Sequence, residues 1–212
     1  MLRFDDDFDP DMMPDGDEDV DVDVEKEEKG EPKRPLLERM LETRTITIFG
    51  EINMKQAQEI TQKLLVLDGD SHDPIKIFIN SPGGHVESGD TIFDMIRFVK
   101  SPVKIVGTGW VASAGALIYA ATEHENRYSL PNTRFLLHQP MGGVRGQAAD
   151  IAIEAEEILK MRHRLNQIFA EQTGQPIEKV EKDTDRNYWM TAREAKEYGL
   201  VGHIVTSADE VA

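Results

Sequence analysis

The chain has 212 residues, a formal net charge of −16 and no cysteine. This length allows one large domain or a domain with appendages. The absence of cysteine excludes disulfides, thiolate zinc sites and cysteine nucleophiles, and it is typical of a cytoplasmic protein. The negative charge argues against binding to a nucleic-acid backbone, and no apolar run approaches the ~20 residues of a membrane span.

Most of the excess charge lies in residues 1–34, which carry 15 acidic and 5 basic side chains, a balance of −10 that leaves −6 for the rest of the chain. Charge repulsion and few large apolar groups predict that this segment is disordered. The alternation of Asp and Val over residues 19–24 is compatible with weak binding of divalent cations, but a solvated tail is favoured because the loop glycine of a calcium site is lacking. We therefore divide the chain into an acidic disordered tail or propeptide (1–34) and a globular domain (35–212).

Strands and helices alternate along the predicted domain. After a short amphipathic segment at 35–41, β-branched and apolar runs predict strands over 43–52, 74–80, 103–107, 127–130, 133–137 and 200–205. Helical spacing predicts one helix that starts after Asn53 and ends at 68–70, and others over 88–99, from the Ser113 region to about 122, and from a capping box at 191–194 to Gly199. This alternation predicts the α/β class with a mostly parallel sheet.

The longest predicted helix runs from about Gln147 to Gln172 and is followed by Gly174 as its stop. At 1.5 Å per residue it spans nearly 40 Å, by estimate too long to lie wholly on a domain of this size. We expect it to pack against another subunit, with a long surface helix as the alternative.

One serine lies among small residues where a predicted strand meets a helix, in the run from Gly107 to Ala116. A serine at such an elbow exposes its hydroxyl beside free N–H groups of the helix N-terminus, which suits a nucleophile. Taken alone, the stretch fits a tight glycine-rich turn equally well. Two more features favour chemistry, because His138 and the pair Gly83–Gly84 each follow a strand and are expected at the same edge of the sheet.

The other histidines are less promising, since they lie in polar loops, on the long helix or in the last strand, and none has a second histidine at metal-ligand spacing. We predict no metal site. A lone histidine after a strand more often has a structural role. The catalytic interpretation of His138 therefore depends on its combination with Ser113.

Several runs together resemble ClpP, the proteolytic subunit family of the Clp protease. They are Ile79–Gly84, Gly109–Ala116, His138–Pro140 with the glycines at 142, 143 and 146, Asp183–Arg186, and Ala195 with Tyr198–Val201. The resemblance covers about residues 36 to 207, and it is specific because separate motifs occur in the family's order and spacing.

This resemblance implies a serine endopeptidase with the ClpP/crotonase-like fold: stacked, mostly parallel sheets, flanking helices and a protruding handle (strand plus long helix, about 139–173). It also implies two stacked heptameric rings and an AAA+ unfoldase, such as ClpX, ClpA or ClpC, that feeds unfolded proteins into the barrel and uses the ATP, while the subunit itself needs no cofactor. By position in the motifs, Ser113 is the nucleophile and His138 the general base. Gly84 and Ala114 fall on the oxyanion-hole positions, and Asp185 and Arg186 on subunit contacts.

The sequence departs from the family pattern at Asn187, which stands where the family has the Asp of its catalytic triad. Asparagine can accept a hydrogen bond from the histidine but cannot supply the charge that stabilises imidazolium. A weakly active or non-catalytic paralogue that acts as a structural ring component, with mixed rings, is therefore the alternative function. A crotonase-type enzyme acting on acyl-CoA thioesters is a third reading, which leaves the Ser113–His138 spacing and the handle unexplained.

Overall fold

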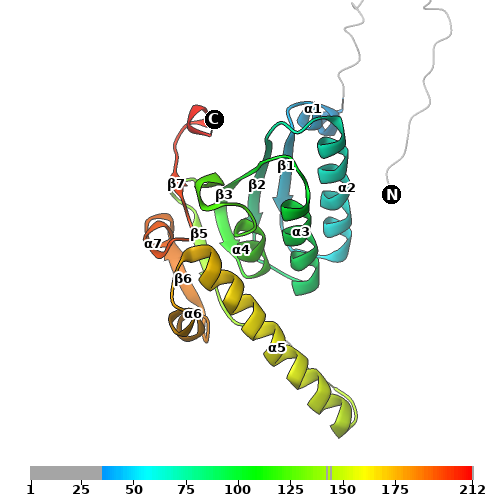
Figure 1. Ribbon diagram of the computed structural model, residues 1–212, viewed down its shortest axis with the longest axis vertical. Coiled ribbons are helices and arrows are strands. Elements are labelled where there is room, and N and C mark those ends of the chain that lie inside the picture. Colours follow the sequence, from blue (N-terminus) through cyan, green and yellow to red (C-terminus); the bar gives the residue numbers. More distant parts are fainter. Residues whose placement is uncertain (1–34, 142, 144, 212) are drawn as a thin grey trace, which may run out of the picture. The chain divides into compact units, whose positions relative to one another are not determined.

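The structure is a computed structural model, and it describes residues 35–141, 143 and 145–211 (Figure 1). The acidic segment 1–34, for which the sequence predicts a disordered tail, lies outside the described residues. None of the helices in the described part combines the length and apolarity needed to cross a membrane.

The α-helices are α1 (Leu36–Glu42), α2 (Met54–Asp70), α3 (Val86–Phe98), α4 (Ala114–Tyr119), α5 (Ala148–Thr173), α6 (Ile177–Asp183) and α7 (Ala192–Tyr198). The strands are β1 (Thr45–Phe49), β2 (Ile75–Ser81), β3 (Val103–Ala112), β4 (Arg127–Ser129), β5 (Arg134–Leu137), β6 (Tyr188–Thr191) and β7 (His203–Ile204). Two short 3₁₀ turns lie at His124–Asn126 and Ala208–Glu210.

Local signals set most element boundaries as predicted. The Asn53 side chain accepts a hydrogen bond from the N–H of Gln56 at the start of α2, and Thr191 with Glu194 forms a complete capping box on α7. Gly174 and Gly199 end α5 and α7 in the left-handed conformation. The alternation of apolar residues along β2 matches its alternation of buried and half-buried positions.

The sheet is parallel except at one pairing, as the sequence predicts. Its strand order is β1-β2-β3-β4-β7, with β5 branching from β3 and β6 pairing antiparallel to β5. Instead of separate stacked sheets, the hydrogen bonds form one branched sheet of seven strands within the described residues. The strands β5 and β6 form a second limb of the sheet, which arises because β3 pairs first with β4 and then with β5.

The strand β3 is longer than predicted because it passes through an irregularity at its middle. Its first part pairs with β4, its last part, Trp110–Ala112, pairs with β5, and the register to β2 shifts between these parts. A bulge of this kind bends a strand and re-aims its side chains. The glycines at 107 and 109 led the sequence prediction to end the strand at 107, whereas the strand continues to Ala112.

Other differences concern short elements. The helix α6 and the strand β6 have no counterpart in the sequence prediction, and the last strand is only His203–Ile204 rather than 200–205. The prediction missed β6 because its neighbour β5 lies far away in the sequence and provides the pairing that makes it a strand.

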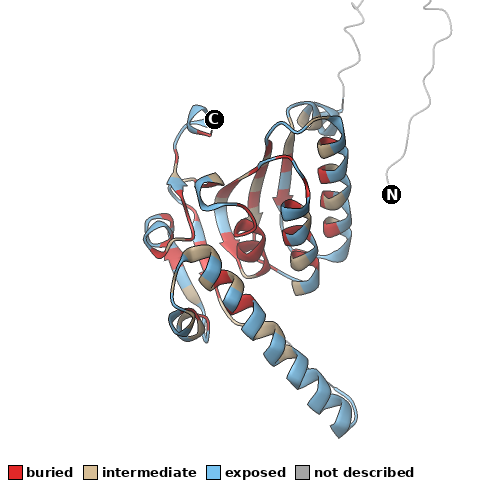
Figure 2. Cartoon of the chain, viewed as in Figure 1, coloured by how far each residue is buried: buried red, intermediate tan, exposed pale blue. Residues whose placement is uncertain are grey.

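The main core lies between the sheet and the helices α2 and α3. Isoleucines of β1 and β2, namely Ile46, Ile48, Ile77 and Ile79, belong to one buried cluster with Ile60, Leu64, Ile92 and Ile96 of the two helices. All six residues of α4 are buried as well (Figure 2). The short helix α4 thus lies inside the domain, which fixes the position of the residue that precedes it.

The helix α5 extends away from the rest of the domain, with most of its length exposed (Figures 1 and 2). Its buried residues, Leu165, Asn166 and Phe169, all lie in its C-terminal third. Towards the other end, Ile153 and Leu159 are 60% and 62% exposed. The predicted strand before this helix is not formed in the described residues of 138–147, because an extended segment becomes a strand only when a neighbouring strand pairs with it.

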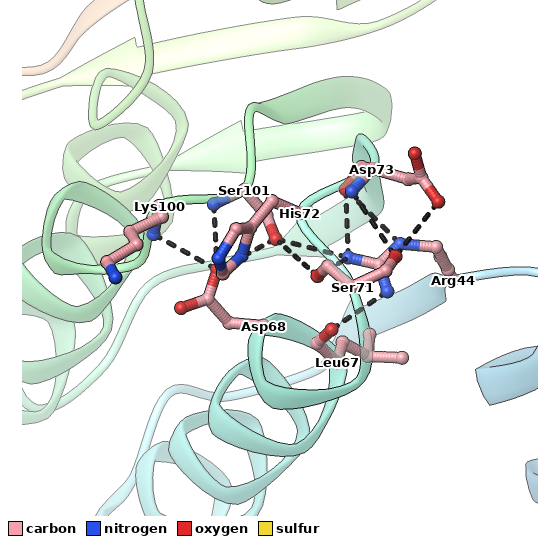
Figure 3. A network of polar contacts seen from close by, with 8 residues as sticks. All are labelled: Arg44, Leu67, Asp68, Ser71, His72, Asp73, Lys100 and Ser101. Carbon is pink, nitrogen blue, oxygen red and sulfur yellow. Dashed lines mark hydrogen bonds and ion pairs between the residues drawn. The ribbon is translucent and has the colours of Figure 1, made fainter.

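A polar network ties the end of α2 to the loop before β3 (Figure 3). The Arg44 guanidinium donates hydrogen bonds to the carbonyl oxygens of Leu67 at 2.8 Å and Ser71 at 3.1 Å, and to the Ser101 hydroxyl at 3.1 Å. The Asp68 carboxylate accepts from the N–H of Lys100 at 3.0 Å and from the N–H and hydroxyl of Ser101, both at 2.8 Å. These bonds satisfy backbone groups at the end of α2 and at the loop that would otherwise lack partners.

We predict that Asp68→Asn changes the acid stability of the domain. Desolvation opposes ionisation, but the hydrogen bonds from Ser101 and from the N–H of Lys100 outweigh it and lower the pKa of Asp68 from 3.8 to about 2. A lowered pKa gives stability that is present above pH 3.8 and is lost as the pH falls towards 2. The variant should therefore lose less stability than the wild type across this window in denaturant unfolding. Asp70→Asn, on an exposed residue of the same helix, is the matched control, and equal acid sensitivity of Asp68→Asn and wild type would contradict the prediction.

Candidate active site

Ser113 lies at the sharp elbow between β3 and α4. Its backbone has φ 55° and ψ −122°, in a region that residues with a side chain rarely adopt. Its N–H donates to the carbonyl oxygen of Leu136 at 3.0 Å, and its own carbonyl accepts from Ala116 and Leu117 in the first turn of α4. The elbow is therefore held by both β5 and the buried helix, and the side chain is left half-buried at the surface of the sheet edge.

The turn after β2 packs directly against this elbow. Gly83 has φ +96°, and a Cβ atom added there would lie 2.5 Å from the Cβ of Ser113 and 2.9 Å from the carbonyl oxygen of Ala112. The next residue, Gly84, bridges to Ile52, whose N–H donates to the Gly83 carbonyl at 2.8 Å. Only a glycine at 83 permits this approach of two backbones.

Two backbone N–H groups at this contact are available as donors. Within the described residues, no hydrogen bond is formed by the N–H of Gly84 or by that of Ala114, the first residue of α4. The first N–H groups of a helix have no partner inside the helix, and they favour negative charge. The pair offers two donors of the kind that an oxyanion site uses, at the positions for which the family resemblance implies that role.

His138 follows β5 directly and is half-buried. Desolvation by this burial lowers the pKa of the His138 imidazole below its usual 6.5, which keeps the ring neutral at neutral pH. Its Nε2 atom is buried and has no hydrogen-bond partner among the described residues. His138 and Ser113 line one small cavity of about 20 Å³, together with Ala114 and residues of α4 and α5, but no hydrogen bond joins the two side chains.

Asn187 lies on the other side of His138. The two residues line a second cavity of about 360 Å³ with Gln139, Met141, Asp185 and Arg186. Asn187 is exposed, and no hydrogen bond links it to His138 in the described structure. The structure thus brings the predicted pair together at one cavity without the contact that a triad needs. Asp185, predicted at a subunit contact, forms an ion pair with Arg162 of α5 at 3.2 Å, and Arg186 is exposed.

Gln139 is a residue of this site that the sequence analysis did not single out. Its N–H donates to the carbonyl oxygen of Thr184, and its side chain donates to the carbonyl oxygen of Asp185 at 2.7 Å. These bonds pin the segment that leads to Asn187 beside His138. The signal was present, because Gln139 belongs to the run His138–Pro140.

No cluster of three or more His, Asp or Glu side chains that could hold a metal ion occurs in the described residues. The site is instead built from one hydroxyl, one neutral imidazole, one amide side chain and two backbone N–H groups. This set of groups is suited to attack on a carbonyl carbon and to stabilisation of the resulting oxyanion.

The comparisons with known proteins agree with this chemistry. The family model described as Clp protease matches residues 28–208. ATP-dependent Clp protease proteolytic subunit 2 of Gluconobacter oxydans is 64% identical over 182 residues, which is 85% of this chain and 82% of that protein. The subunit of the same description from Pseudomonas aeruginosa is 54% identical over 83% of this chain and 88% of its own length.

Solved structures of ClpP1 from Listeria monocytogenes are similar as well. One of them, an asparagine-to-aspartate mutant, has a TM-score of 0.79 at 53% identity and covers 84% of this chain and 100% of its own. The structure of ClpP1 without that mutation gives a TM-score of 0.77 at the same identity and coverage.

We predict that Gly83→Ala destabilises the domain far more than Gly50→Ala. Both glycines have positive φ, but a Cβ at Gly50 meets nothing within 4 Å, whereas one at Gly83 meets the Ser113 elbow. We expect a loss of about 1–2 kcal/mol in unfolding free energy for Gly50→Ala and a further loss of about 1–3 kcal/mol for Gly83→Ala, because overpacking is added to the strain. Denaturant unfolding at equal protein concentration measures both, and equal losses would show that the two backbones are not in contact.

Proposed function

This chain belongs to the Clp protease family and is an ATP-dependent Clp protease proteolytic subunit, and we propose that Ser113, His138 and Asn187 carry out its peptide hydrolysis. It is a serine endopeptidase of a family that needs no cofactor of its own. The observation that carries the proposal is the strained elbow at Ser113, which shares a cavity with His138. The similarity to proteolytic subunits gives no support to the alternative of an acyl-CoA enzyme.

In the proposed reaction, the Ser113 Oγ attacks the carbonyl carbon of the peptide while His138 accepts the hydroxyl proton. The tetrahedral intermediate collapses, the C–N bond breaks, and the imidazolium returns the proton to the leaving amine. The acyl group now forms an ester with Ser113. A water molecule attacks this ester while His138 accepts its proton, and when the C–O bond to Ser113 breaks the imidazolium returns the proton to the Ser113 Oγ, so that the carboxylic acid and the free serine are released.

The charge of each tetrahedral intermediate falls on the former carbonyl oxygen. We propose that the N–H groups of Gly84 and Ala114 donate to it, in support of which neither has another partner in the described part of the chain. A donor of this kind contributes about 3 kcal/mol to the transition state. Because both donors belong to the backbone, their position depends on the contact between the Gly83 turn and the elbow.

The weak point of the proposed triad is Asn187. As the partner of His138, its amide oxygen would accept a hydrogen bond from Nδ1–H, but it would leave the imidazolium without a counter-charge. Two observations favour the second candidate function, a weakly active or non-catalytic ring component: the His138 Nε2 has no partner among the residues that the structure describes, and the side chain of Asn187 is exposed. In that case a different subunit in a mixed ring supplies the order that this site lacks.

The protein works as an oligomer with an ATPase partner. More finely, we propose two stacked heptameric rings, homomeric or mixed, that receive unfolded proteins from an AAA+ unfoldase in the cytoplasm. The division into a tail (1–34) and a peptidase domain (35–212) with a handle at about 139–173 belongs to this proposal. In its support, the exposed apolar side chains of α5 lie far from the core and suit contact with a second ring, and Asp185 forms an ion pair with Arg162 of α5. The tail is then either removed or placed at the axial pore.

We predict that Asn187→Asp raises activity and shifts its pH dependence. The carboxylate would stabilise the imidazolium, so the pKa of His138 would rise, and the acidic limb of kcat/KM would move from below pH 6.5 to a higher pH. In the trypsin-type triad the reverse change costs about 10⁴ in kcat, which sets the upper bound of the gain. Peptidase assays across pH 5–9 and labelling with a fluorophosphonate measure the effect.

Ser113→Ala is the control for that experiment and should abolish labelling in both backgrounds. Labelling that persists without the Ser113 hydroxyl would overturn the assignment of the nucleophile. Labelling of Asn187→Asp but not of the wild type would establish the second candidate function for the homomeric protein.

We predict that Leu159→Lys separates the two rings. Leu159 is 62% exposed on α5, and a charge there would be buried without a partner in a ring-to-ring contact. Native mass spectrometry should show heptamers in place of double rings. Glu154→Lys, an exposed charge change on the same helix, is the matched control, and double rings that persist in Leu159→Lys would place the contact elsewhere.

A further inference from the structure

An exposed aromatic cluster lies on the second limb of the sheet. The indole rings of Trp110 on β3 and Trp189 on β6 are stacked, with centroids 6.4 Å apart and an angle of 7° between their planes. The guanidinium carbon of Arg134 on β5 lies 4.4 Å from the centre of the Trp189 ring. Trp110 is 43% exposed and Trp189 is 36% exposed. We refer to these three residues as the aromatic platform.

The register of the strands places the platform on one face of the limb. Trp110 pairs with Arg134 across β3 and β5, and Trp189 pairs with Leu136 across β6 and β5. Arg134 and Leu136 are two residues apart, so their side chains lie on the same face of β5. The opposite face carries Phe135, which is fully buried and packs edge-on against Tyr119 of α4. The platform is therefore the uncovered side of a limb whose other side is core.

The side chains of the platform already contact one another in the absence of a ligand. Each indole has only two rotatable side-chain bonds, and the stacking and cation–π contacts restrict both. Side chains held in this way lose little conformational entropy on binding, so most of the free energy of contact with another ring contributes to affinity. Exposed tryptophan and arginine side chains with this geometry are typical of binding surfaces rather than of bare surface.

The residues of the proposed active site lie close in sequence to the three strands of the platform. Ser113 follows Trp110 by three residues, His138 follows Arg134 by four, and Asn187 precedes Trp189 by two. At about 3.3 Å per strand residue these separations are roughly 7–13 Å along the chain. A substrate in extended conformation covers that distance with two to four residues.

Arg134 adds a charge preference to the platform. It forms no ion pair with any residue of the described ranges, so no carboxylate in that part of the chain neutralises its positive charge. A peptide with a carboxylate next to an aromatic side chain would satisfy both features at once, because the ring can stack on an indole and the carboxylate can meet the guanidinium. An unfolded polypeptide displays such segments, whereas a folded protein buries its aromatic side chains.

We propose that the aromatic platform is a binding subsite for an aromatic side chain of the unfolded polypeptide substrate, beside the bond that is cut. The inference rests on the proposed peptidase function of Ser113 and His138, and it adds a preference for substrates with Phe, Tyr or Trp a few residues from the cleavage point. Trp110, Trp189 and Arg134 are specificity-determining residues in this reaction and take no part in the chemical steps.

The chain contains only two tryptophans, and both belong to the platform. Intrinsic tryptophan fluorescence of the full chain therefore reports on this surface alone, without a label. We would use Ser113→Ala to prevent cleavage and titrate it with two eight-residue peptides that lack tryptophan. They are identical except for one position beside an Asp, which is Phe in the first and Leu in the second. We expect saturable binding with an affinity about fivefold higher for the Phe peptide, the size of one aromatic contact.

Variants test whether the preference belongs to the platform. Trp189→Leu should remove the preference for the Phe peptide, with Trp110 still reporting, while Trp189→Phe should retain most of it. Arg134→Gln should weaken the binding of both peptides, because both carry the Asp. Phe98→Ala, which removes an exposed aromatic side chain of α3, is the matched control and should leave both affinities unchanged. In Ser113-containing protein the same preference should appear in KM, with kcat little changed.

Three results would overturn the proposal. Equal affinity for the two peptides would show that no aromatic side chain is recognised. Protection of both tryptophans from acrylamide quenching in the assembled protein, or emission that depends on protein concentration, would show that a second copy of the chain covers the platform. Failure of fluorophosphonate labelling together with a retained Phe preference would instead refute only the proposed catalysis, so the two failures are distinguishable.

Discussion

The close contact between the turn after β2 and the elbow after β3 is the constraint on which the site depends. Two backbones meet there with no room for a Cβ at Gly83. The contact holds Ser113 at a positive φ that serine rarely adopts. The buried helix α4 and the hydrogen bond from Ser113 to Leu136 keep the elbow in place from the other sides. Strain of this kind persists only where the surroundings over-determine it, and here three elements do so.

Much of the fold follows from local sequence signals. The cap at Asn53, the box at Thr191 and the stop at Gly174 set helix ends, and the alternation of isoleucines in β2 sets its buried face. The parts that the sequence did not predict depend on distant partners. The strand β6 exists because β5 pairs with it, and β3 continues past Gly107 because a bulge lets it exchange β4 for β5. No window of neighbouring residues contains that information.

The candidate site, like the fold, can be predicted from the sequence only in part. The order of the motifs predicts that Ser113, His138 and the two glycines meet at one edge of the sheet, because parallel strands bring their carboxyl ends together. The sequence could not predict how well these groups are aligned. The buried, unpartnered Nε2 of His138 depends on side-chain geometry at the scale of a single hydrogen bond, and the support that Gln139 gives to the segment before Asn187 depends on contacts across 46 positions of the chain.

The attachment of α5 makes it a lever. Its anchoring contacts lie in its C-terminal half, and two of the anchoring side chains, Leu165 and Phe169, also line the cavity of Ser113 and His138. From Leu165 to the first residue of the helix, Ala148, the distance is about 25 Å at 1.5 Å per residue, so a tilt of about 10° at the anchor moves the far end by about 4 Å. A side chain that enters the cavity and shifts Leu165 or Phe169 slightly therefore causes a larger displacement of the free end of α5. The orientation of the free end therefore depends in part on two residues that also line the candidate site.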